Sequence, residues 1–359
     1  MKKSKILVGG LTILFITFVL VMGGCALLFG GKKGEEDVID IANFTNRSML
    51  QAVSRVTDDG QEKDSPLVSP DGSRLLYCER QTVFNKETNQ WMIQSNIVML
   101  RNVNSSAKTP LVTTGNAFTP GWYEDSTRYL YSFSENNTRR IVRSSSAGGG
   151  RTNITRNPVG INDQSPVIKN GVILITALDR EFGGKWSIYS MLENGNDITR
   201  LGEGYDPAWH PTEPKFLYIK STAPNSPSGI WEMDMRTMQE TLLYEMPRYN
   251  IRRPQFTYDG RHIVFQRGSE QMVTGTQVVT TSSTFGIKSN KQTKTSNTET
   301  RWQLYSITAE GFNESVLTEG NVDCTHPSLD QDNNLFFLSN ASGVKSNKIE
   351  IYKARLNFD

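Results

Sequence analysis

From about residue 50 onward, short apolar runs alternate with turn residues, and one pattern of apolar and polar positions returns six times. Each copy has a proline, an apolar residue two places later, a turn, and then a nearly continuous apolar run. The apolar residues that follow the prolines are Val68, Trp122, Ile168, Trp209, Phe256 and Leu329. Apolar runs of four to eight residues bounded by turns are typical of buried strands. Each copy therefore predicts a pair of strands joined by a turn.

Two further segments complete each repeat. The turns carry pairs such as Asp71-Gly72 and Asn170-Gly171, which favour tight antiparallel hairpins. A third segment alternates apolar and polar residues, as in 186–190, and alternation is typical of a strand with one solvated face. A short fourth segment follows, as in 111–113. The repeat is thus predicted to be a four-stranded antiparallel unit.

The spacing of the units indicates the architecture. The prolines that open them are Pro66, Pro120, Pro166, Pro207, Pro254 and Pro327. Because a proline can start a strand but cannot donate within a ladder, we expect each to lie at the entry of the innermost strand. Subtracting successive numbers gives steps of 54, 46, 41, 47 and 73. A propeller blade of four strands takes about 40–50 residues. We therefore predict an all-β fold, a six-bladed β-propeller over residues 50–359.

The sixth repeat has three predicted strands before Asp359. Residues 53–57, Val-Ser-Arg-Val-Thr, have the outer-strand pattern and precede the first proline. We expect this N-terminal strand to close the last blade, which removes an exposed sheet edge.

The step of 73 comes from an insertion, residues 272–300, between the second and third strands of the fifth repeat. Its Val/Thr-rich part, 278–285, is predicted to extend a hairpin beyond the ring, whereas its Lys/Asn/Thr-rich part, 288–294, reads as mobile. Loops of this length are either functional or disordered. Both a binding role and a passive one stay open.

Residues 1–30 are predicted to attach the chain to a membrane, and residues 31–49 to form a polar linker. Three lysines precede an apolar run, 6–22, that ends in Gly23-Gly24-Cys25. This resembles a bacterial lipoprotein signal, which implies lipidation of Cys25. The apolar character also continues to Phe29, which is long enough for an uncleaved transmembrane anchor. Either reading places the propeller outside the cytoplasm, in the cell envelope.

Charge and cysteine content narrow the function class. The 359 residues include 39 Lys and Arg against 37 Asp and Glu, so no bulk attraction to nucleic acid is expected. Besides Cys25 there are only Cys78 and Cys324. They lie in repeats that a closed ring would make neighbours, and they form either a single bridge or two buried thiols.

The first repeat, Pro66-Leu67-Val68-Ser69-Pro70-Asp71-Gly72 followed by Ser73 to Tyr77, resembles the TolB-like family of β-propeller repeats. The resemblance extends over roughly residues 50–359 in six units. It implies a six-bladed fold and an exported location. Because one fold hosts many activities, it implies no function by itself.

Four aspartates lie one to four residues before the prolines: Asp64, Asp163, Asp206 and Asp323. We expect them, with His326, to surround one mouth of the central channel. Carboxylates there would hold a cation such as calcium or receive the basic loop of a partner. Alternatively, each aspartate caps a turn by accepting backbone N–H groups.

Catalytic motifs are absent from the sequence. It has no Gly-x-Ser-x-Gly elbow of a serine hydrolase. Some TolB-like propellers are lyases with a metal held by several histidines, but the three histidines here, His210, His262 and His326, fall in different repeats. We therefore expect no catalytic residue, no catalytic metal site and no cofactor, and a calcium ion at the channel-mouth carboxylates stays open as an alternative. Most tryptophans lie on strands and read as core, whereas Trp91 sits beside a long first-repeat loop and is expected to be exposed.

These observations favour a non-catalytic, monomeric propeller that acts as a binding platform for a cell-envelope protein or polymer. The alternative is a carbohydrate-active lyase or hydrolase with its site at the channel mouth.

Overall fold

The computed structural model describes residues 41–358, apart from 86–88, 101, 106, 136–137, 157–158, 180–182, 222–227, 247–248, 283–287 and 342–348, and without the side chains of 85 and 269–300. The predicted anchor with Cys25 and most of the predicted linker lie outside these residues. Within them, no helix has the length and apolar character needed to cross a membrane.

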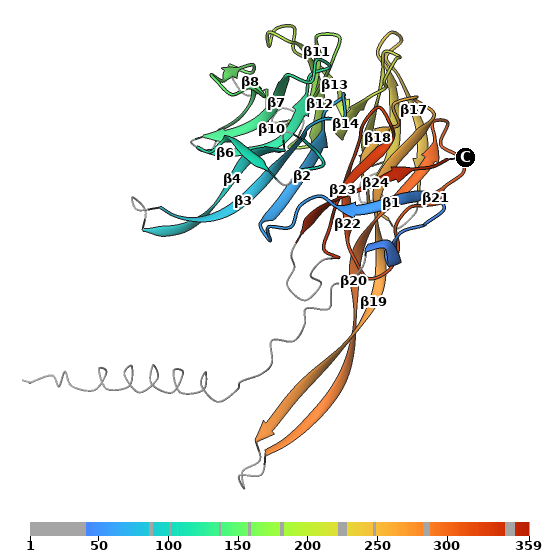
Figure 1. The fold of residues 1–359 in the computed structure, drawn as a ribbon. Coiled ribbons are helices and arrows are strands. Elements are labelled where there is room, and N and C mark those ends of the chain that lie inside the picture. The colour runs from blue at the N-terminus through green and yellow to red at the C-terminus, as the bar shows by residue number, and fades with distance from the viewer. Residues whose placement is uncertain are drawn as a thin grey trace, which may run out of the picture. The chain divides into compact units, whose positions relative to one another are not determined.

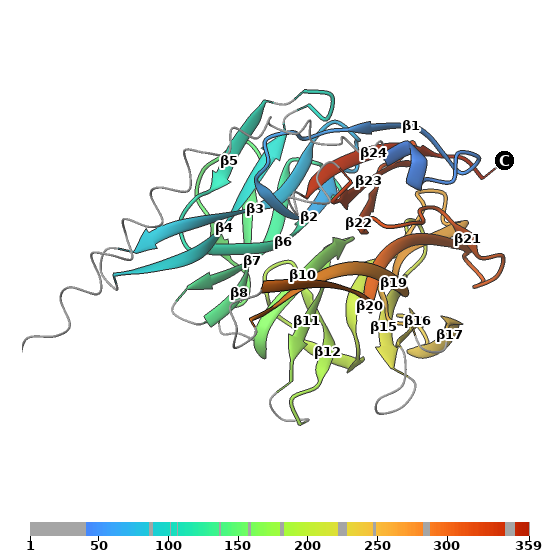
Figure 2. The ribbon, with the colours of Figure 1, turned by 90° about the horizontal axis from the view of Figure 1, so that it is seen from below.

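The described chain forms six four-stranded antiparallel sheets arranged as the blades of a propeller (Figures 1 and 2). Blade 1 contains β2 (Glu62–Val68), β3 (Leu75–Asn85), β4 (Gln90–Leu100) and β5 (Lys108–Val112). Blade 2 contains β6 (Asn116–Trp122), β7 (Arg128–Glu135), β8 (Thr138–Ser145) and β9 (Thr152–Asn153). Blade 3 contains β10 (Ile161–Lys169), β11 (Val172–Leu178), β12 (Trp186–Leu192) and β13 (Thr199–Glu203). The six-bladed fold predicted from the repeats is confirmed.

The remaining blades follow the same order from the inner to the outer strand. Blade 4 contains β14 (Tyr205–Trp209), β15 (Lys215–Ser221), β16 (Ser228–Asp234) and β17 (Gln239–Glu245). Blade 5 contains β18 (Ile251–Phe256), β19 (His262–Ser282), β20 (Lys288–Thr308) and β21 (Ser315–Val316). Blade 6 contains β22 (Cys324–Leu329), β23 (Asn334–Ser339), β24 (Glu350–Leu356) and β1 (Leu50–Arg55).

The ring is closed by its N-terminal strand, as predicted. β1 pairs antiparallel with the C-terminal strand β24, with Leu50 opposite Leu356 and Arg55 opposite Tyr352. Leu50 is 1% exposed and packs among residues of blades 5 and 6. The N-terminal strand therefore supplies the outer edge of the last blade, and its apolar residue anchors it there.

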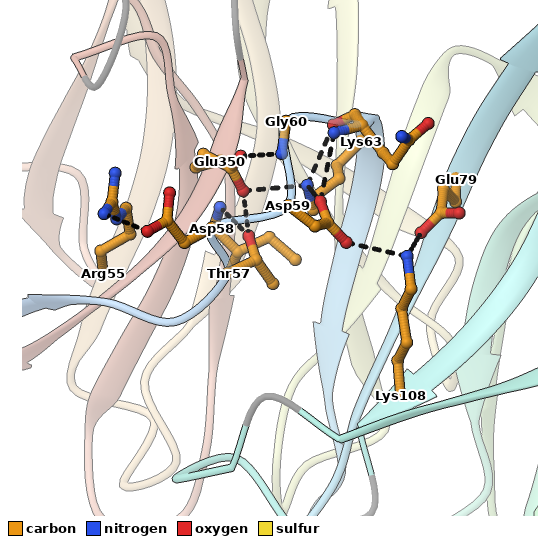
Figure 3. A network of polar contacts seen from close by, with 11 residues as sticks. Arg55, Thr57, Asp58, Asp59, Gly60, Lys63, Glu79, Lys108 and Glu350 are labelled. Atoms are coloured by element: carbon orange, nitrogen blue, oxygen red, sulfur yellow. Dashed lines mark hydrogen bonds and ion pairs between the residues drawn. The ribbon is translucent and has the colours of Figure 1, made fainter.

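A network of polar contacts follows this strand and joins blade 6 to blade 1 (Figure 3). Glu350 accepts hydrogen bonds from the Thr57 hydroxyl at 2.6 Å and from the Gly60 N–H at 2.9 Å. Lys63 contacts both Glu350 and Asp59. Lys108 then joins Asp59 to Glu79. The chain from β1 to β2 is thereby fixed to β24.

The inner strand of every blade carries the same irregularity at its proline. In β2, Asp64 pairs with Cys78 and Leu67 with Leu76, so Ser65 and Pro66 together oppose Tyr77. The pairing registers shift at the equivalent place in β6, β10, β14, β18 and β22. Two residues opposite one define a β-bulge. A proline, which has no N–H to give to a ladder, is tolerated there. The prolines thus lie within the inner strands, whereas the sequence pattern placed them at the strand entries.

The core lies between neighbouring blades. One cluster, for example, combines Leu76 and Ile97 of blade 1 with Tyr129 and Val142 of blade 2. Continuous apolar runs on the second strands fit this arrangement, because both faces of each sheet are covered. Cys78 and Cys324 are free, buried thiols in separate clusters, so the bridge that the sequence left open is not formed. Burial raises the pKa of each to about 12.

Two hairpins extend beyond their blades on the same side of the ring (Figure 1). β3 and β4 pair as far as Asn85 and Gln90. β19 and β20 pair continuously from His262 opposite Thr308 to Ser282 opposite Lys288. The insertion 272–300 is thus built mainly from a long hairpin. Residues 288–294, which read as mobile in the sequence, form part of its second strand because they pair with 276–282.

Residues 41–49, which the sequence assigned to a polar linker, pack against the ring. The 3-10 turn η2 (Ile41–Phe44) places Ile41 in a core cluster at 5% exposure. The Phe44 carbonyl accepts a hydrogen bond from the Glu319 N–H at 2.9 Å, and Asn46 N–H donates to Leu317 O at 2.9 Å. Isolated apolar residues in a polar stretch gave too sparse a pattern to predict this contact.

Candidate binding site in the central channel

The six bulges converge on the central channel. The residue before each proline has a positive φ, between 41° and 56°. These residues are Ser65, Thr119, Ser165, Asp206, Arg253 and His326, and all six line one cavity of about 410 Å³. We call them the channel ring. Residues other than glycine rarely adopt this conformation, yet the bulge imposes it once in every blade.

The cavity occupies the half of the channel toward the turns between first and second strands. Its lining runs from the channel ring and the prolines to residues of those turns, including Pro70, Glu124, His210 and Tyr258. The two long hairpins are connections between second and third strands. Since neighbouring strands are antiparallel, the cavity opens on the face opposite to these hairpins.

The channel ring is chemically divided. Blades 1 to 3 supply three hydroxyl groups, Ser65, Thr119 and Ser165, whereas blades 4 to 6 supply Asp206, Arg253 and His326. A ligand in the cavity would therefore meet neutral hydrogen-bonding groups on one side and ionisable groups on the other.

Side chains of the channel ring also join adjacent blades. The Thr119 hydroxyl accepts the backbone N–H of Ser165 at 3.1 Å, and Asp206 Oδ2 accepts the backbone N–H of Arg253 at 3.2 Å. The His326 N–H donates to Gln266 Oε1 at 2.7 Å. Thr119 and Asp206 thus serve the blade junctions as well as the cavity.

Arg253 is the unusual member of the channel ring. Its side chain is half-buried. Among the described residues, its guanidinium forms neither an ion pair nor a hydrogen bond, although most partly buried arginines of the chain do, such as Arg200 with Asp179 and Arg267 with Glu314. A guanidinium presents five N–H donors that match a carboxylate. Arg253 is therefore available to an anionic ligand.

His326 and Asp64 form the principal ion pair beside the cavity. His326 Nε2 lies 2.9 Å from Asp64 Oδ1, and His326 Nδ1 lies 3.0 Å from the Thr325 hydroxyl. Asp64 also accepts from Ser65 Oγ at 3.1 Å and from Arg80 at 2.7 Å. Both imidazole nitrogens and both carboxylate oxygens thus have partners within the protein. The pair is suited to positioning rather than to proton transfer.

Electrostatics favour the neutral imidazole and the ionised carboxylate. Burial and the positive charge of Arg253 lower the pKa of His326, against the opposing influence of Asp64. Burial works to raise the pKa of Asp64, but the hydrogen bond from His326 and the charges of Arg253 and Arg80 outweigh it and hold that pKa well below its usual value. In this state the imidazole donates Nε2–H to the carboxylate.

Two of the predicted aspartates neither line the cavity nor contact His326. Asp163 is fully buried and accepts the backbone N–H groups of Val159 and Gly160 at 2.9 and 3.0 Å. Burial raises its pKa to about 6 despite these bonds. Asp323 accepts the Trp302 N–H at 2.9 Å and contacts Arg301 at 3.2 Å. The capping alternative therefore describes both residues better than a shared channel mouth does.

The five predicted residues consequently separate in space. Asp206 and His326 line the cavity, Asp64 contacts His326, and Asp163 and Asp323 hold backbone groups elsewhere. Arg253 and the three hydroxyl residues were not predicted. The available signal was their position immediately before each proline, whereas the prediction rested on acidic residues up to four places before it.

The histidines do not converge on one another. His210 Nδ1 accepts the backbone N–H groups of Thr212 and Glu213, and His262 stacks on Phe358 with ring centroids 3.8 Å apart. Within the described ranges, no group of three or more His, Cys, Asp or Glu side chains is arranged to hold a metal ion.

These features define a six-bladed β-propeller with a polar channel site. No family model matches the chain, and no curated protein matches it either. Its fold is similar to that of several solved structures. A gluconolactonase from Xanthomonas campestris superposes with a TM-score of 0.53 at 13% identity, covering 89% of this chain and 94% of that one.

Two TolB structures are similarly related. TolB from Acinetobacter baumannii gives a TM-score of 0.51 at 14% identity, covering 80% of this chain and 64% of that one. A putative TolB from Agrobacterium tumefaciens gives 0.50 at 15% identity, covering 69% and 86%. The match thus spans less than two thirds of the Acinetobacter protein. The TolB-like propeller fold is confirmed, and at these identities the similarity concerns the fold alone.

Proposed function

We propose that the protein is a non-catalytic binding platform of the cell envelope, and that its channel ring holds a carboxylate carried by a protein partner. The observation that supports this is Arg253. Arg253 lines a cavity of about 410 Å³. In the part of the chain that the structure describes, its backbone N–H bonds to Asp206 but its guanidinium has no ion-pair or hydrogen-bond partner. An Arg–carboxylate pair is often bidentate and is stronger than a neutral hydrogen bond.

The rest of the channel ring suits the same ligand. Thr119 and Ser165 offer hydroxyl donors on the opposite side of the cavity, whereas the Ser65 hydroxyl donates to Asp64. The prolines of the six bulges, with Trp122 and Trp209, supply apolar walls. A pocket that is largely apolar with a few convergent polar groups is the usual form of a ligand site. An acidic side chain or a C-terminal carboxylate of a partner could bind Arg253 on one side of the channel ring and the hydroxyl groups on the other.

The location is part of the proposal. The lysine-flanked apolar segment of residues 1–30 attaches the propeller to a membrane, either through lipidated Cys25 or as an uncleaved span. The propeller then works as a monomer in the periplasm or outside the cell. The TolB-like fold supports this reading by analogy.

A photo-reactive amino acid at Gln331, in the cavity lining, tests the proposal in intact cells. We expect one protein to be cross-linked reproducibly, and to be lost in Arg253→Ala. Arg236→Ala is the matched control, because Arg236 lies in the turn between β16 and β17 with a 67% exposed side chain. If a glycan is cross-linked and no protein is, the partner is an envelope polymer and not a protein. Cross-linking that ignores Arg253 would refute the carboxylate site.

The alternative function, a carbohydrate-active lyase or hydrolase, is supported by the His326–Asp64 pair beside the cavity. Acid–base catalysis would require His326 to exchange one of its present partners for substrate. Cleavage of envelope oligosaccharides by the purified protein, abolished in His326→Gln, would favour this alternative. Absence of cleavage together with a captured protein partner would favour the platform.

A further inference from the structure

The outer part of the hairpin of β3 and β4 carries exposed apolar side chains that the channel site does not use. β2 pairs with β3 only as far as Arg80, and β5 pairs with β4 only from Ile97 onward. Residues 81–84 and 90–93 therefore form a two-stranded ribbon with no described flanking strand. We call these residues the blade 1 ribbon. A two-stranded ribbon is marginally stable in water without a covering surface.

The blade 1 ribbon is apolar where a solvated hairpin would be polar. Trp91 is 71% exposed and Ile93 65%, and Phe84 and Met92 are 44% and 45% exposed. Phe84 and Trp91 are opposite each other and stack edge to face, with centroids 5.2 Å apart. Clusters of large exposed apolar side chains mark interaction surfaces.

Apolar groups stand on both faces of the blade 1 ribbon. Directly opposed residues point to the same face, and successive residues alternate. Phe84, Trp91 and Ile93 therefore share one face, whereas Met92 and its partner Val83 share the other. A protein groove would cover one of these faces, whereas a lipid interface surrounds both.

The composition agrees with a membrane interface. Residues 81–84 and 90–93 read Gln-Thr-Val-Phe and Gln-Trp-Met-Ile, with no charged residue, whereas residues 85–89 between them read Asn-Lys-Glu-Thr-Asn. Charged side chains are costly in the hydrocarbon core, so this composition fits the headgroup level and not a deeper position. Tryptophan is enriched at the headgroup level of membranes, because its ring is apolar and its N–H is polar. Uncharged glutamine and threonine are compatible with the same depth.

The start of the described chain lies on the same face of the ring. Residues 44–46 bond to residues 317–319, in the connection from the outer strand of blade 5 to the inner strand of blade 6. In an antiparallel propeller these connections share a face with the second-to-third strand hairpins. The apolar segment ends near residue 30, so ten residues, 31–40, separate it from Ile41. Fully extended, they reach at most roughly 40 Å.

We propose that the blade 1 ribbon inserts its apolar side chains into the interface of the membrane to which the N-terminal segment attaches the protein. The inference rests on the membrane attachment in the proposed function, but not on the channel ligand. It orients the propeller with its hairpin face toward the lipid and its channel cavity away from it.

Tryptophan quenching in vesicles tests this orientation. The full chain is reconstituted into phosphatidylcholine vesicles with bromine on the acyl chains, and the emission of Trp91 is obtained by subtracting that of Trp91→Phe. We expect bromolipid to quench the Trp91 emission and aqueous iodide to leave it unchanged. Since the blade 1 ribbon is uncharged, adding anionic lipid should not alter the result.

A second variant supplies the matched control. Phe312→Trp in the Trp91→Phe background places an indole at a site that is 68% exposed in wild type, in the turn between β20 and β21 on the opposite face. Its emission should be quenched by iodide and not by bromolipid. If the protein floats with the vesicles but Trp91 behaves like this control, the ribbon does not enter the membrane. If the protein does not float at all, the membrane attachment fails as well. Neither result depends on Arg253.

Discussion

Lys63 of the first blade and Glu350 of the last form a buried ion pair, with Lys63 Nζ 2.9 Å from Glu350 Oε2 and side chains 0% and 2% exposed. The two residues are almost 300 positions apart in the sequence. The contact lies where the ring is closed, beside the hydrogen bonds that Glu350 accepts from Thr57 and Gly60 (Figure 3). The ion pair therefore stabilises the junction of blades 6 and 1. Contacts between residues close in sequence cannot do so, because this junction joins opposite ends of the chain.

We expect Lys63→Met to lower the free energy of unfolding by about 3–5 kcal/mol, because it leaves the charge of Glu350 buried without its principal partner. Thermal and chemical unfolding would measure the change. Lys63→Met with Glu350→Gln should recover part of the loss. Arg55→Met is the control, since the Arg55–Asp58 pair is 35% and 70% exposed, and its removal should cost less than about 1 kcal/mol. Equal losses in the two variants would mean that the buried pair has no special role.

Gly121→Ala should destabilise the junction of blades 2 and 3. A Cβ at Gly121 would lie 2.1 Å from the carbonyl oxygen of Pro166, so a blade must move. Overpacking of this kind costs about 1–3 kcal/mol or more, which a lower melting temperature would reveal. Gly150→Ala is the matched control, because no atom lies within 4 Å of its added Cβ. An unchanged melting temperature for Gly121→Ala would show that the inner strands yield easily.

Arg253→Ala should raise the pKa of His326, because it removes a positive charge that opposes protonation. Titration of the histidine resonances by NMR would detect the shift. The sign has a consequence for stability in the wild type. Since folding lowers the pKa of His326, its contribution is present above about pH 6.5 and is lost as the pH falls below that value.

Arg261→Ala provides the control for this titration. Arg261 lowers the pKa of His262 and is not among the groups that shift His326. The control should therefore move the His262 resonance and leave that of His326 in place. A His326 titration that is the same in wild type and Arg253→Ala would place the guanidinium outside the reach of the imidazole.

Asp163→Asn should change the pH dependence of stability. The pKa of Asp163 is raised to about 6 by burial, so the wild type loses stability as the pH rises from about 4 to about 6. The shift of about two units corresponds to about 3 kcal/mol. The variant lacks this titration, so its unfolding free energy relative to wild type should increase with pH over that range. If the difference in unfolding free energy between the variant and wild type did not change with pH, the raised pKa of Asp163 would be contradicted.

Asp125→Asn is the control for this measurement, because folding lowers the pKa of Asp125 and raises that of Asp163. Asp125 accepts backbone and Arg128 hydrogen bonds that lower its pKa to about 2 against the influence of burial. Its contribution is present above pH 4 and is lost toward pH 2. Between pH 4 and 6 the variant should therefore run parallel to wild type, which makes it a suitable reference.

The fold was predictable because the residues that specify each blade lie within one repeat of the sequence. The turn pairs and the apolar run of the second strand, such as Leu75 to Tyr77, specify a hairpin locally, and six copies specify a ring. The bulge was not predictable, because a proline is compatible with both a strand entry and an irregular strand. The register that distinguishes them depends on the partner strand.

The site was predictable only in part, for reasons that particular residues illustrate. Asp206 and His326 line the channel cavity, since their position beside the proline sets their direction. Asp163 and Asp323 were predicted to lie at the channel because they are close to a proline in sequence. Their carboxylates instead accept hydrogen bonds from backbone N–H groups. Lys63 gave no signal, because a lysine is ordinarily exposed and its partner lies at the other end of the chain.

The bulges of the inner strands separate the frame of the propeller from its chemistry. The proline and the opposing residue, such as Pro66 and Tyr77, belong to the packed blade, whereas the residue before the proline faces the channel. At Arg253 and Ser165 the backbone N–H, rather than the side chain, makes the contact with the preceding blade. Such positions can exchange one side chain for another while the blade stays intact. The ligand selectivity of the channel can therefore be changed one blade at a time, by substituting the residue before the proline.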